Sequence, residues 1–239
     1  GSWWKGLAVV LGGLRRNLVL GKRPIELPRV GAVGFAVGHL KVHRYGQVDM
    51  CGFAAAWWRG MYRAKQPGSG WTKDQVGDLV FYGAMGVIVG GRLGYVFFYN
   101  IDKFLADPLW LFAVWTGGMS FHGGAIGVLV AFWLFARKTG KRYFQVADFM
   151  VPMVPIGLAT GRFGNFMNAE LWGRASDAPW ATVFPTDPLQ IARHPSQLYE
   201  MLLEGVLLFL VLWVYSAKPR PAGWLTALFG IGYVCACTF

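Results

Sequence analysis

Apolar residues along this chain fall into about six long runs, separated by shorter polar or charged segments. The runs lie near residues 33–58, 79–99, 109–136, 146–168, 198–216 and 222–239. An α-helix needs about 20 consecutive apolar residues to cross the hydrocarbon core of a bilayer. The pattern therefore predicts an all-α fold, a polytopic membrane helical bundle with about six spans. The first run is the weakest, because His43, Arg44 and Asp49 interrupt it.

The loops between these runs predict an orientation. Every second loop is basic, at residues 59–73, 137–142 and 218–221. Basic loops stay in the cytoplasm, so the longer, mixed loop near residues 168–196 is expected to form a small outward-facing loop domain. We expect residues 1–32 to be an unassigned N-terminal segment and residues 33–239 to form a single membrane-embedded domain.

Composition supports a membrane setting and weakens the case for other classes of protein. Hydrophobic residues make up 55% of the 239 residues and charged residues only 15%, whereas soluble domains carry about 25% charge. The net charge of +11 comes from basic residues placed between apolar runs. That placement fits membrane lipid headgroups better than nucleic acid. The three cysteines have no metal-ligand spacing, so no metal site is expected.

The segment 161–174 is the most informative part of the chain, because polar groups close an apolar run there. It carries Arg162, Asn165, Asn168 and Glu170 among glycines. Such groups are costly at membrane depth and usually face a wet cavity or one another. The segment therefore predicts a polar pocket in a lipid-embedded wall.

Arginine is the side chain in this pocket best suited to an anionic ligand. A guanidinium is always charged and can bind two phosphate oxygens at once. Arg162 is therefore a candidate phosphate ligand, and the alternative is a structural pair with Asp148 or Glu170. Arg92, also flanked by glycines, is a candidate second headgroup contact or equally a packing ion pair.

Two further motifs carry titratable groups. His122 precedes Gly123 and Gly124, and an imidazole can accept a proton from a thiol or hydroxyl. The alternative is a histidine bonded to a carbonyl, with glycines serving helix packing.

The segment 193–200 combines a helix start at Pro195 and Ser196 with possible cavity partners, namely His194, Tyr199 and Glu200. Glu204 lies four residues after Glu200, so both project from one helical face, and pairing with Arg162 or Arg92 is the favoured explanation. Tyr45 is expected to be an interfacial anchor.

Five motifs of this chain resemble those of the bacterial phosphatidylglycerol–prolipoprotein diacylglyceryl transferase family. They lie at residues 67–71, 90–95, 122–124, 161–174 and 193–200. The resemblance covers roughly residues 33–234. It implies a seven-span enzyme of the inner membrane, with its active site toward the periplasm. The implied reaction moves the diacylglyceryl group of phosphatidylglycerol to the lipobox cysteine of a preprolipoprotein, forming a thioether and releasing glycerol phosphate. It implies no metal and no other cofactor.

The resemblance also implies residue roles. His122 is the candidate base, and Arg162 with Asn165 holds the phosphate. The headgroup pocket is shaped by Asn168, Glu170, Arg92, His194 and Glu200. Tyr45 and Tyr233 match family positions linked to activity.

The chain departs from the family pattern at three places. Arg44 stands where the family has tryptophan, Cys237 stands where it has arginine, and the chain stops at Phe239 before the last helix. We therefore expect a truncated or altered copy. Two alternative functions remain open, a membrane transporter and a non-catalytic binder of anionic phospholipid, including an inactive degenerate copy.

Overall fold

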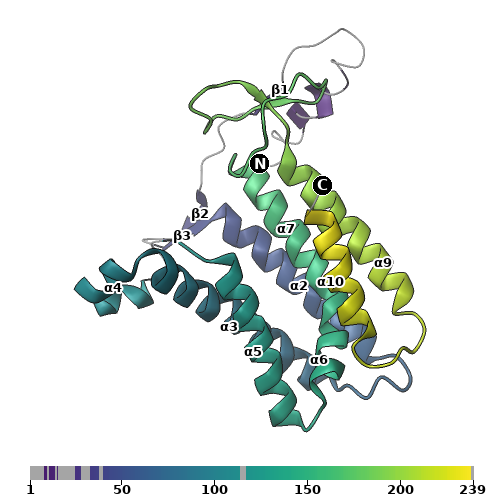
Figure 1. Cartoon of the computed structure of the whole chain (residues 1–239). Helices are drawn as coiled ribbons and strands as arrows, with labels where there is room; N and C mark the ends of the chain where they lie inside the picture. Colours follow the sequence, from purple (N-terminus) through teal and green to yellow (C-terminus); the bar gives the residue numbers. More distant parts are fainter. Residues whose placement is uncertain are drawn as a thin grey trace. The chain divides into compact units, whose positions relative to one another are not determined.

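The chain is mostly helical in this computed structural model, which describes residues 8–9, 11–13, 15, 25–27, 33–37, 40–113 and 117–237 (Figure 1). It separates into two compact units. The first unit comprises Gly1–Ala55, Met153–Ala217 and Leu228–Phe239, and the second comprises Ala56–Pro152 and Lys218–Ala227.

The described helices are, in chain order, α2 (Arg44–Ala64), α3 (Lys73–Tyr99), α4 (Ile101–Ala106), η1 (Pro108–Phe112), α5 (Phe121–Thr139), α6 (Tyr143–Met150), η3 (Val151–Met153), α7 (Val154–Met167), α8 (Ser196–Glu200), η4 (Met201–Leu207), α9 (Leu208–Tyr215) and α10 (Trp224–Cys237). The described strands are β1 (Ile25–Glu26), β2 (Val33–Val37), β3 (Leu40–His43), β4 (Thr182–Val183) and β5 (Ala192–Arg193).

Helices α3 and α5 form the centre of the second unit. Helix α3 begins with a capping box, in which Thr72 and Gln75 satisfy each other's backbone N–H groups. Ser120 caps α5 by accepting from the Gly123 N–H at 3.2 Å. Small residues let two helix backbones approach closely. Accordingly, a Cβ atom added at Gly90 would collide with the Gly123 carbonyl oxygen, and one added at Gly127 with the Gly86 carbonyl oxygen.

Substituting Gly127 with alanine is expected to destabilise the second unit by about 1–3 kcal/mol, because the collision would be with backbone that cannot rotate away. Gly77→Ala is the matched control. Gly77 lies in the same helix pair, in α3, and its added Cβ would meet nothing within 4 Å. Alanine favours a helix over glycine, so this control should be neutral or slightly stabilising. Thermal unfolding of the detergent-solubilised chain measures both, and equal unfolding temperatures would contradict the packing role.

The first unit contains a small core beside a three-stranded sheet. The strand order is β1-β4-β5, with β1 parallel and β5 antiparallel to β4. The buried core comprises Ile25, Leu27, Phe166, Met167, Ala169 and Phe184. Residues from the N-terminal region, the end of α7 and the long loop therefore form one compact unit with the predicted polar segment 161–174.

The structure corrects two predicted helices. Residues 33–37 and 40–43, expected to begin the first span, instead form the antiparallel strands β2 and β3. The predicted span over 109–136 is also wrong in its first part, because η1 ends at Phe112 and α5 begins only at Phe121. Gly117 and Gly118, with φ of 80° and 84°, adopt a left-handed conformation that no α-helix contains.

Among the described residues, three helical segments are long and apolar enough to cross a membrane, at Lys73–Tyr99, Tyr143–Met167 and Ser196–Tyr215. The helix Trp224–Cys237 is apolar but shorter. These segments support a helical membrane protein.

Candidate functional site

Arg162 lies in the first unit between two carboxylates. Its Nε is 2.9 Å from Glu200 Oε2 and 3.4 Å from Glu204 Oε2. Its Nη2 donates to the same Glu204 oxygen at 3.4 Å. The Glu204 side chain is only 1% exposed, whereas that of Arg162 is 24% exposed. The prediction that Glu200 and Glu204 share a face and pair with an arginine is therefore confirmed.

Close packing of two helices makes this cluster possible. A Cβ atom added at Gly205 would lie 2.5 Å from the Ala159 Cβ, so η4 and α7 touch at this point. Arg162 follows Ala159 by about one helical turn, and Glu204 precedes Gly205 directly. The η4 segment is π-helical, a geometry frequent at functional sites. The glycine in η4 therefore brings the carboxylates to the guanidinium.

The alternative partners expected for Arg162 are bound elsewhere. Asp148 accepts hydrogen bonds from the Gly223 N–H at 2.6 Å, and from the Thr226 N–H and hydroxyl at 2.8 and 2.6 Å. It thereby joins α6 to the start of α10 within the second unit. Glu170 is exposed, and its Oε1 accepts from Asn168 Nδ2 at 3.3 Å.

The two motifs that the sequence singled out, 161–174 and 193–200, meet along their length. The Gly173 N–H donates to the His194 carbonyl, and the His194 N–H to the Arg174 carbonyl, each at 3.0 Å. Ser196 Oγ donates to the Leu171 carbonyl at 3.0 Å, and Gln197 Nε2 to the Glu170 carbonyl at 2.6 Å. With the Arg162–Glu200 pair, these contacts form a continuous seam between the motifs.

The turn after α7 is strained. Ala169 and Leu171 have φ of 56° and 57°, which is unusual for residues other than glycine. The Glu170 N–H between them donates to the Asn165 carbonyl at 3.0 Å. Asn165 is buried, and Asn168 and Glu170 contact each other. Strain of this kind persists where surrounding contacts enforce it, often at functional sites.

Helix α10 contributes two predicted positions to this cluster. The Cys237 thiol donates to Glu204 Oε1 at 3.2 Å. Tyr233 lies one turn earlier and is hydrogen-bonded to Cys237. Cys237 therefore lies directly against the buried carboxylate.

Sequence reasoning missed two residues of this region. Gln197 is fully buried and holds the Glu170 carbonyl, yet its position in a helix start attracted no functional interpretation. Trp180 Nε1 donates to the Tyr199 hydroxyl at 2.6 Å, and that hydroxyl lies 3.0 Å from His194 Nδ1. Nothing in the local sequence distinguishes this tryptophan from an interfacial anchor.

Arg92 belongs to the second unit and is 3% exposed. Its guanidinium donates to the carbonyls of Trp110, Leu111 and Gly117 at 2.7, 2.9 and 2.7 Å. It also lies 4.6 Å from the Trp110 ring centroid. These contacts anchor the loop before α5 to α3. The expected structural alternative for Arg92 was a packing ion pair, and the structure shows backbone carbonyls as its partners instead. A headgroup contact stays a prediction.

His122 lies in the first turn of α5 and is exposed. Its ring lies edge-on to Phe121, with centroids 5.9 Å apart. Gly123 and Gly124 after it are buried, and Gly123 packs on α3 at Gly90 and Gly94. The glycines thus serve helix packing, while the imidazole stays accessible. Tyr45 falls in the first turn of α2, and its side chain lies outside the described residues.

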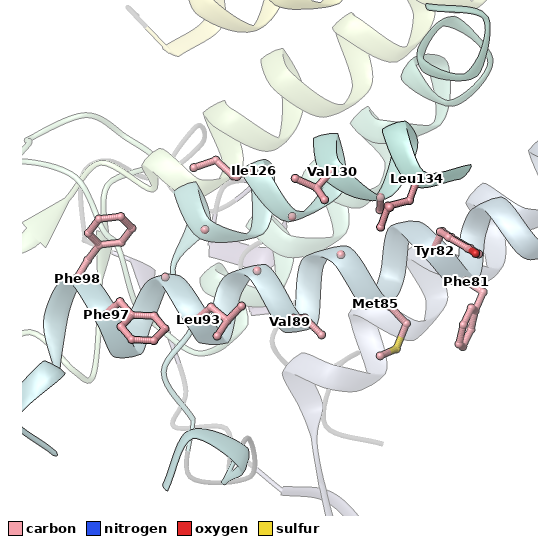
Figure 2. A pocket seen from close by; sticks show the side chains of 16 residues that line it. Phe81, Tyr82, Met85, Val89, Leu93, Phe97, Phe98, Ile126, Val130 and Leu134 are labelled. Carbon is pink, nitrogen blue, oxygen red and sulfur yellow. The ribbon is translucent and has the colours of Figure 1, made fainter. Parts of the chain in front are cut away.

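An apolar groove of about 620 Å³ runs along the α3–α5 pair. Figure 2 shows Ile126, Val130 and Leu134 of α5 in a row beside side chains of α3 such as Val89 and Leu93. Gly123, next to His122, also lines it. The groove can accept a hydrocarbon chain, and it reaches the helix turn that carries the exposed imidazole.

A buried ion pair holds the loop near β5. Arg193 Nε and Nη2 donate to Asp187 Oδ2 and Oδ1 at 2.6 and 3.1 Å. The Arg193 guanidinium also lies 4.2 Å from the Trp172 ring centroid. The hydrogen bonds from Arg193 hold the pKa of the Asp187 carboxyl below its ordinary value of 3.8. The charged pair therefore favours the folded loop.

Acidification is expected to loosen this loop below pH 3.8. Because the folded pKa of Asp187 is lowered, its contribution to stability is complete above the ordinary value and is lost as the pH falls through the folded value. Hydrogen exchange of residues 182–193, followed by mass spectrometry, should accelerate as the pH falls below 3.8, after correction for the pH dependence of the intrinsic exchange rates. Asp187→Asn should exchange faster at pH 7 and lose the acid transition. An unchanged transition in this variant would assign it to another group.

Comparisons with known proteins match most of the chain. A family model described as prolipoprotein diacylglyceryl transferase matches residues 32–239. The relatives include proteins named phosphatidylglycerol–prolipoprotein diacylglyceryl transferase, among them those from three bacteria. The one from Coxiella burnetii (strain RSA 331 / Henzerling II) is 58% identical over 207 residues, covering 86% of this chain and 78% of the relative. The one from Vibrio vulnificus (strain YJ016) is 56% identical over 209 residues, covering 87% of this chain and 77% of the relative. The one from Ectopseudomonas mendocina (strain ymp) is 54% identical over 209 residues, covering 87% of this chain and 79% of the relative.

Proposed function

Because the chain belongs to the prolipoprotein diacylglyceryl transferase family, we propose that it transfers the diacylglyceryl group of phosphatidylglycerol to the lipobox cysteine of a preprolipoprotein. The observation that carries this proposal is the seam between segments 161–174 and 193–200, which joins Arg162 to Glu200 and Glu204. The family motifs are therefore assembled into one polar cluster within an apolar fold.

The reaction exchanges one bond at a glyceryl carbon. The substrate's cysteine sulfur forms a C–S bond to that carbon as the bond from the carbon to the phosphate oxygen breaks. The electron pair leaves with glycerol phosphate, and the thiol proton passes to a base. Because the thiolate is the nucleophile, the chain itself must supply a proton acceptor and positive charge for the phosphate.

Arg162 is the group that we assign to the phosphate. Glu200 and Glu204 contact its Nε and Nη2, and among the described residues no hydrogen bond involves its Nη1. The carboxylates thus hold the guanidinium in one orientation, and the Nη1 edge remains for a phosphate oxygen. Asn165, Asn168 and Glu170, on the turn that follows, complete the headgroup pocket in this proposal.

The base and the lipid chains are assigned to the second unit. His122 is exposed at the start of α5 and can accept the thiol proton. An acyl chain of the substrate would lie in the groove along α3 and α5, which reaches Gly123 beside it. The proposal keeps the other predicted roles. The headgroup pocket includes Arg92, His194 and Glu200, and activity also depends on Tyr45 and Tyr233.

Filling the groove should weaken binding of long-chain substrate. Val130→Trp is expected to raise the KM for phosphatidylglycerol roughly tenfold, equivalent to losing the burial of about two methylene groups at ~0.8 kcal/mol each. Leu129→Trp is the matched control, because Leu129 is an exposed neighbour on α5 that does not line the groove. The difference should shrink with short-chain phosphatidylglycerol. Equal KM values for the two variants would place the acyl chain elsewhere.

The membrane arrangement is part of the same proposal. Residues 33–239 form one domain with about six spans, against seven in the family, in the bacterial inner membrane. The basic loops 59–73, 137–142 and 218–221 face the cytoplasm. The loop domain near 168–196 and the active site then face the periplasm.

The test is mass spectrometry of a lipobox-cysteine peptide incubated with phosphatidylglycerol and membranes that contain the chain. A diacylglyceryl mass gain with equimolar release of glycerol phosphate is expected. Glycerol phosphate release without the peptide adduct would indicate hydrolysis instead of transfer. Movement of labelled phosphatidylglycerol across a vesicle wall without cleavage would support the transporter, and binding alone would support the inactive copy.

A further inference from the structure

The side chains of Trp180 and His194, in the loop domain, both contact the hydroxyl group of Tyr199, in the helix that follows. Trp180 lies just before β4, His194 just after β5, and Tyr199 in α8. The Tyr199 oxygen is 2.6 Å from Trp180 Nε1 and 3.0 Å from His194 Nδ1. The Tyr199 phenol therefore connects Trp180 to His194 through two hydrogen bonds.

The donors in this arrangement determine where the protons lie. An indole N–H can only donate, so the Tyr199 oxygen accepts from Trp180. The phenol O–H is then available to donate to His194 Nδ1, and all three groups are satisfied. If Nδ1 carried the proton instead, the phenol would accept twice, and its own O–H would have no acceptor among the described residues. The hydrogen bonds therefore favour the His194 tautomer with its proton on Nε2.

The backbone of His194 is held independently of its ring. Its carbonyl accepts from the Gly173 and Ser196 N–H groups at 3.0 and 2.9 Å, and its N–H donates to the Arg174 carbonyl at 3.0 Å. Only rotation about the side-chain bonds remains, and Tyr199 determines that rotation. His194 is thereby fixed beside segment 161–174.

We propose that Trp180 and Tyr199 are positioning residues that hold His194 in the Nε2–H tautomer, so that this imidazole donates a hydrogen bond to the anionic headgroup. The proposal rests on the proposed function for its ligand. It gives two histidines different roles: His194 donates in a hydrogen bond, and His122, in the second unit, accepts a proton from the thiol. A phosphate oxygen is the acceptor that such a donor fits.

Nitrogen-15 NMR of the full chain in nanodiscs of phosphatidylcholine tests the tautomer directly. The chain has four histidines, and His194→Gln assigns the signal. We expect the proton on Nε2 and a hydrogen-bonded, unprotonated Nδ1. Tyr199→Phe should give a mixture of tautomers, and Trp180→Phe a smaller change in the same direction. Tyr99→Phe removes an exposed phenol outside the cluster and should change nothing.

Titration with phosphatidylglycerol tests the ligand. The His194 Nε2–H signal should shift with phosphatidylglycerol and not with added phosphatidylcholine. In the transfer assay, Tyr199→Phe should raise the KM for phosphatidylglycerol roughly threefold to tenfold with little change in kcat.

A wild-type proton on Nδ1, or a Tyr199→Phe tautomer identical to wild type, would overturn the proposal. The NMR readout needs no turnover. A chain that shows the tautomer switch and the lipid shift but no transfer would contradict only the proposed function.

Discussion

Arg162→Gln is expected to lower kcat/KM for diacylglyceryl transfer by about 10²–10³-fold, the usual cost of removing a group that stabilises charge in the transition state. The guanidinium is held by Glu200 and Glu204, so its position does not have to be established when substrate binds. The loss should appear mainly in kcat, because charge on the phosphate oxygen grows as the carbon–oxygen bond breaks. The mass-spectrometric assay described above measures it.

This substitution also leaves a buried carboxylate without its cation, so stability must be separated from activity. Glu204 is 1% exposed, and breaking a buried pair by removing one partner costs about 3–5 kcal/mol. The double variant Arg162→Gln with Glu204→Gln removes both charges and should recover most of that stability. Arg137→Gln, the same change at an exposed arginine in α5, is the control. Recovery of activity together with stability in the double variant would assign Arg162 a purely structural role.

His122→Gln is expected to lower the transfer rate by about 10²–10⁴-fold, the range for loss of a general base. Glutamine keeps a similar size and polarity at the start of α5 but cannot take the thiol proton. The effect should fall on the chemical step, with the KM for phosphatidylglycerol nearly unchanged. Single-turnover measurement of thioether formation at saturating lipid isolates that step.

A peptide with selenocysteine in the lipobox distinguishes a base from a structural histidine. A selenol ionises near neutral pH without help, so this acceptor should react with His122→Gln and wild type at similar rates. His194→Gln offers the comparison, because a headgroup donor should not be rescued by a more acidic nucleophile. If the selenol peptide is equally slow with His122→Gln, the base is another group.

Local patterns predicted much of the site because they depend on residues close in sequence. The spacing of Glu200 and Glu204 placed both on one helical face, and both contact an arginine. The start of a helix at Pro195 and Ser196 is likewise confirmed, since α8 begins at Ser196. The motifs also identified the family, which the comparisons confirm. Each of these inferences needs only helical periodicity or residue type.

Predictions failed where a distant contact competes with local preference. Hydrophobicity alone extended a span back to residue 109, but Gly117 and Gly118 turn the chain, and Arg92 binds the carbonyls of that loop. A guanidinium that binds backbone carbonyls leaves no pattern in the sequence of its partners, since every residue has a carbonyl. The same reason hides Gln197, which holds the Glu170 carbonyl.

The sequence alone established a helical membrane protein of the prolipoprotein diacylglyceryl transferase family. It also singled out segments 161–174 and 193–200 as the candidate site. These conclusions follow from apolar run length, charge placement and residue type, which are properties of the chain before it folds. The partners of these residues follow from the tertiary structure alone. Glu204 rather than Asp148 or Glu170 lies against Arg162, and Trp180 reaches His194 through Tyr199. Such pairings depend on how helices and loops pack, for example Gly205 against Ala159. The separation of two residues along the sequence does not determine how far apart they lie in the folded chain.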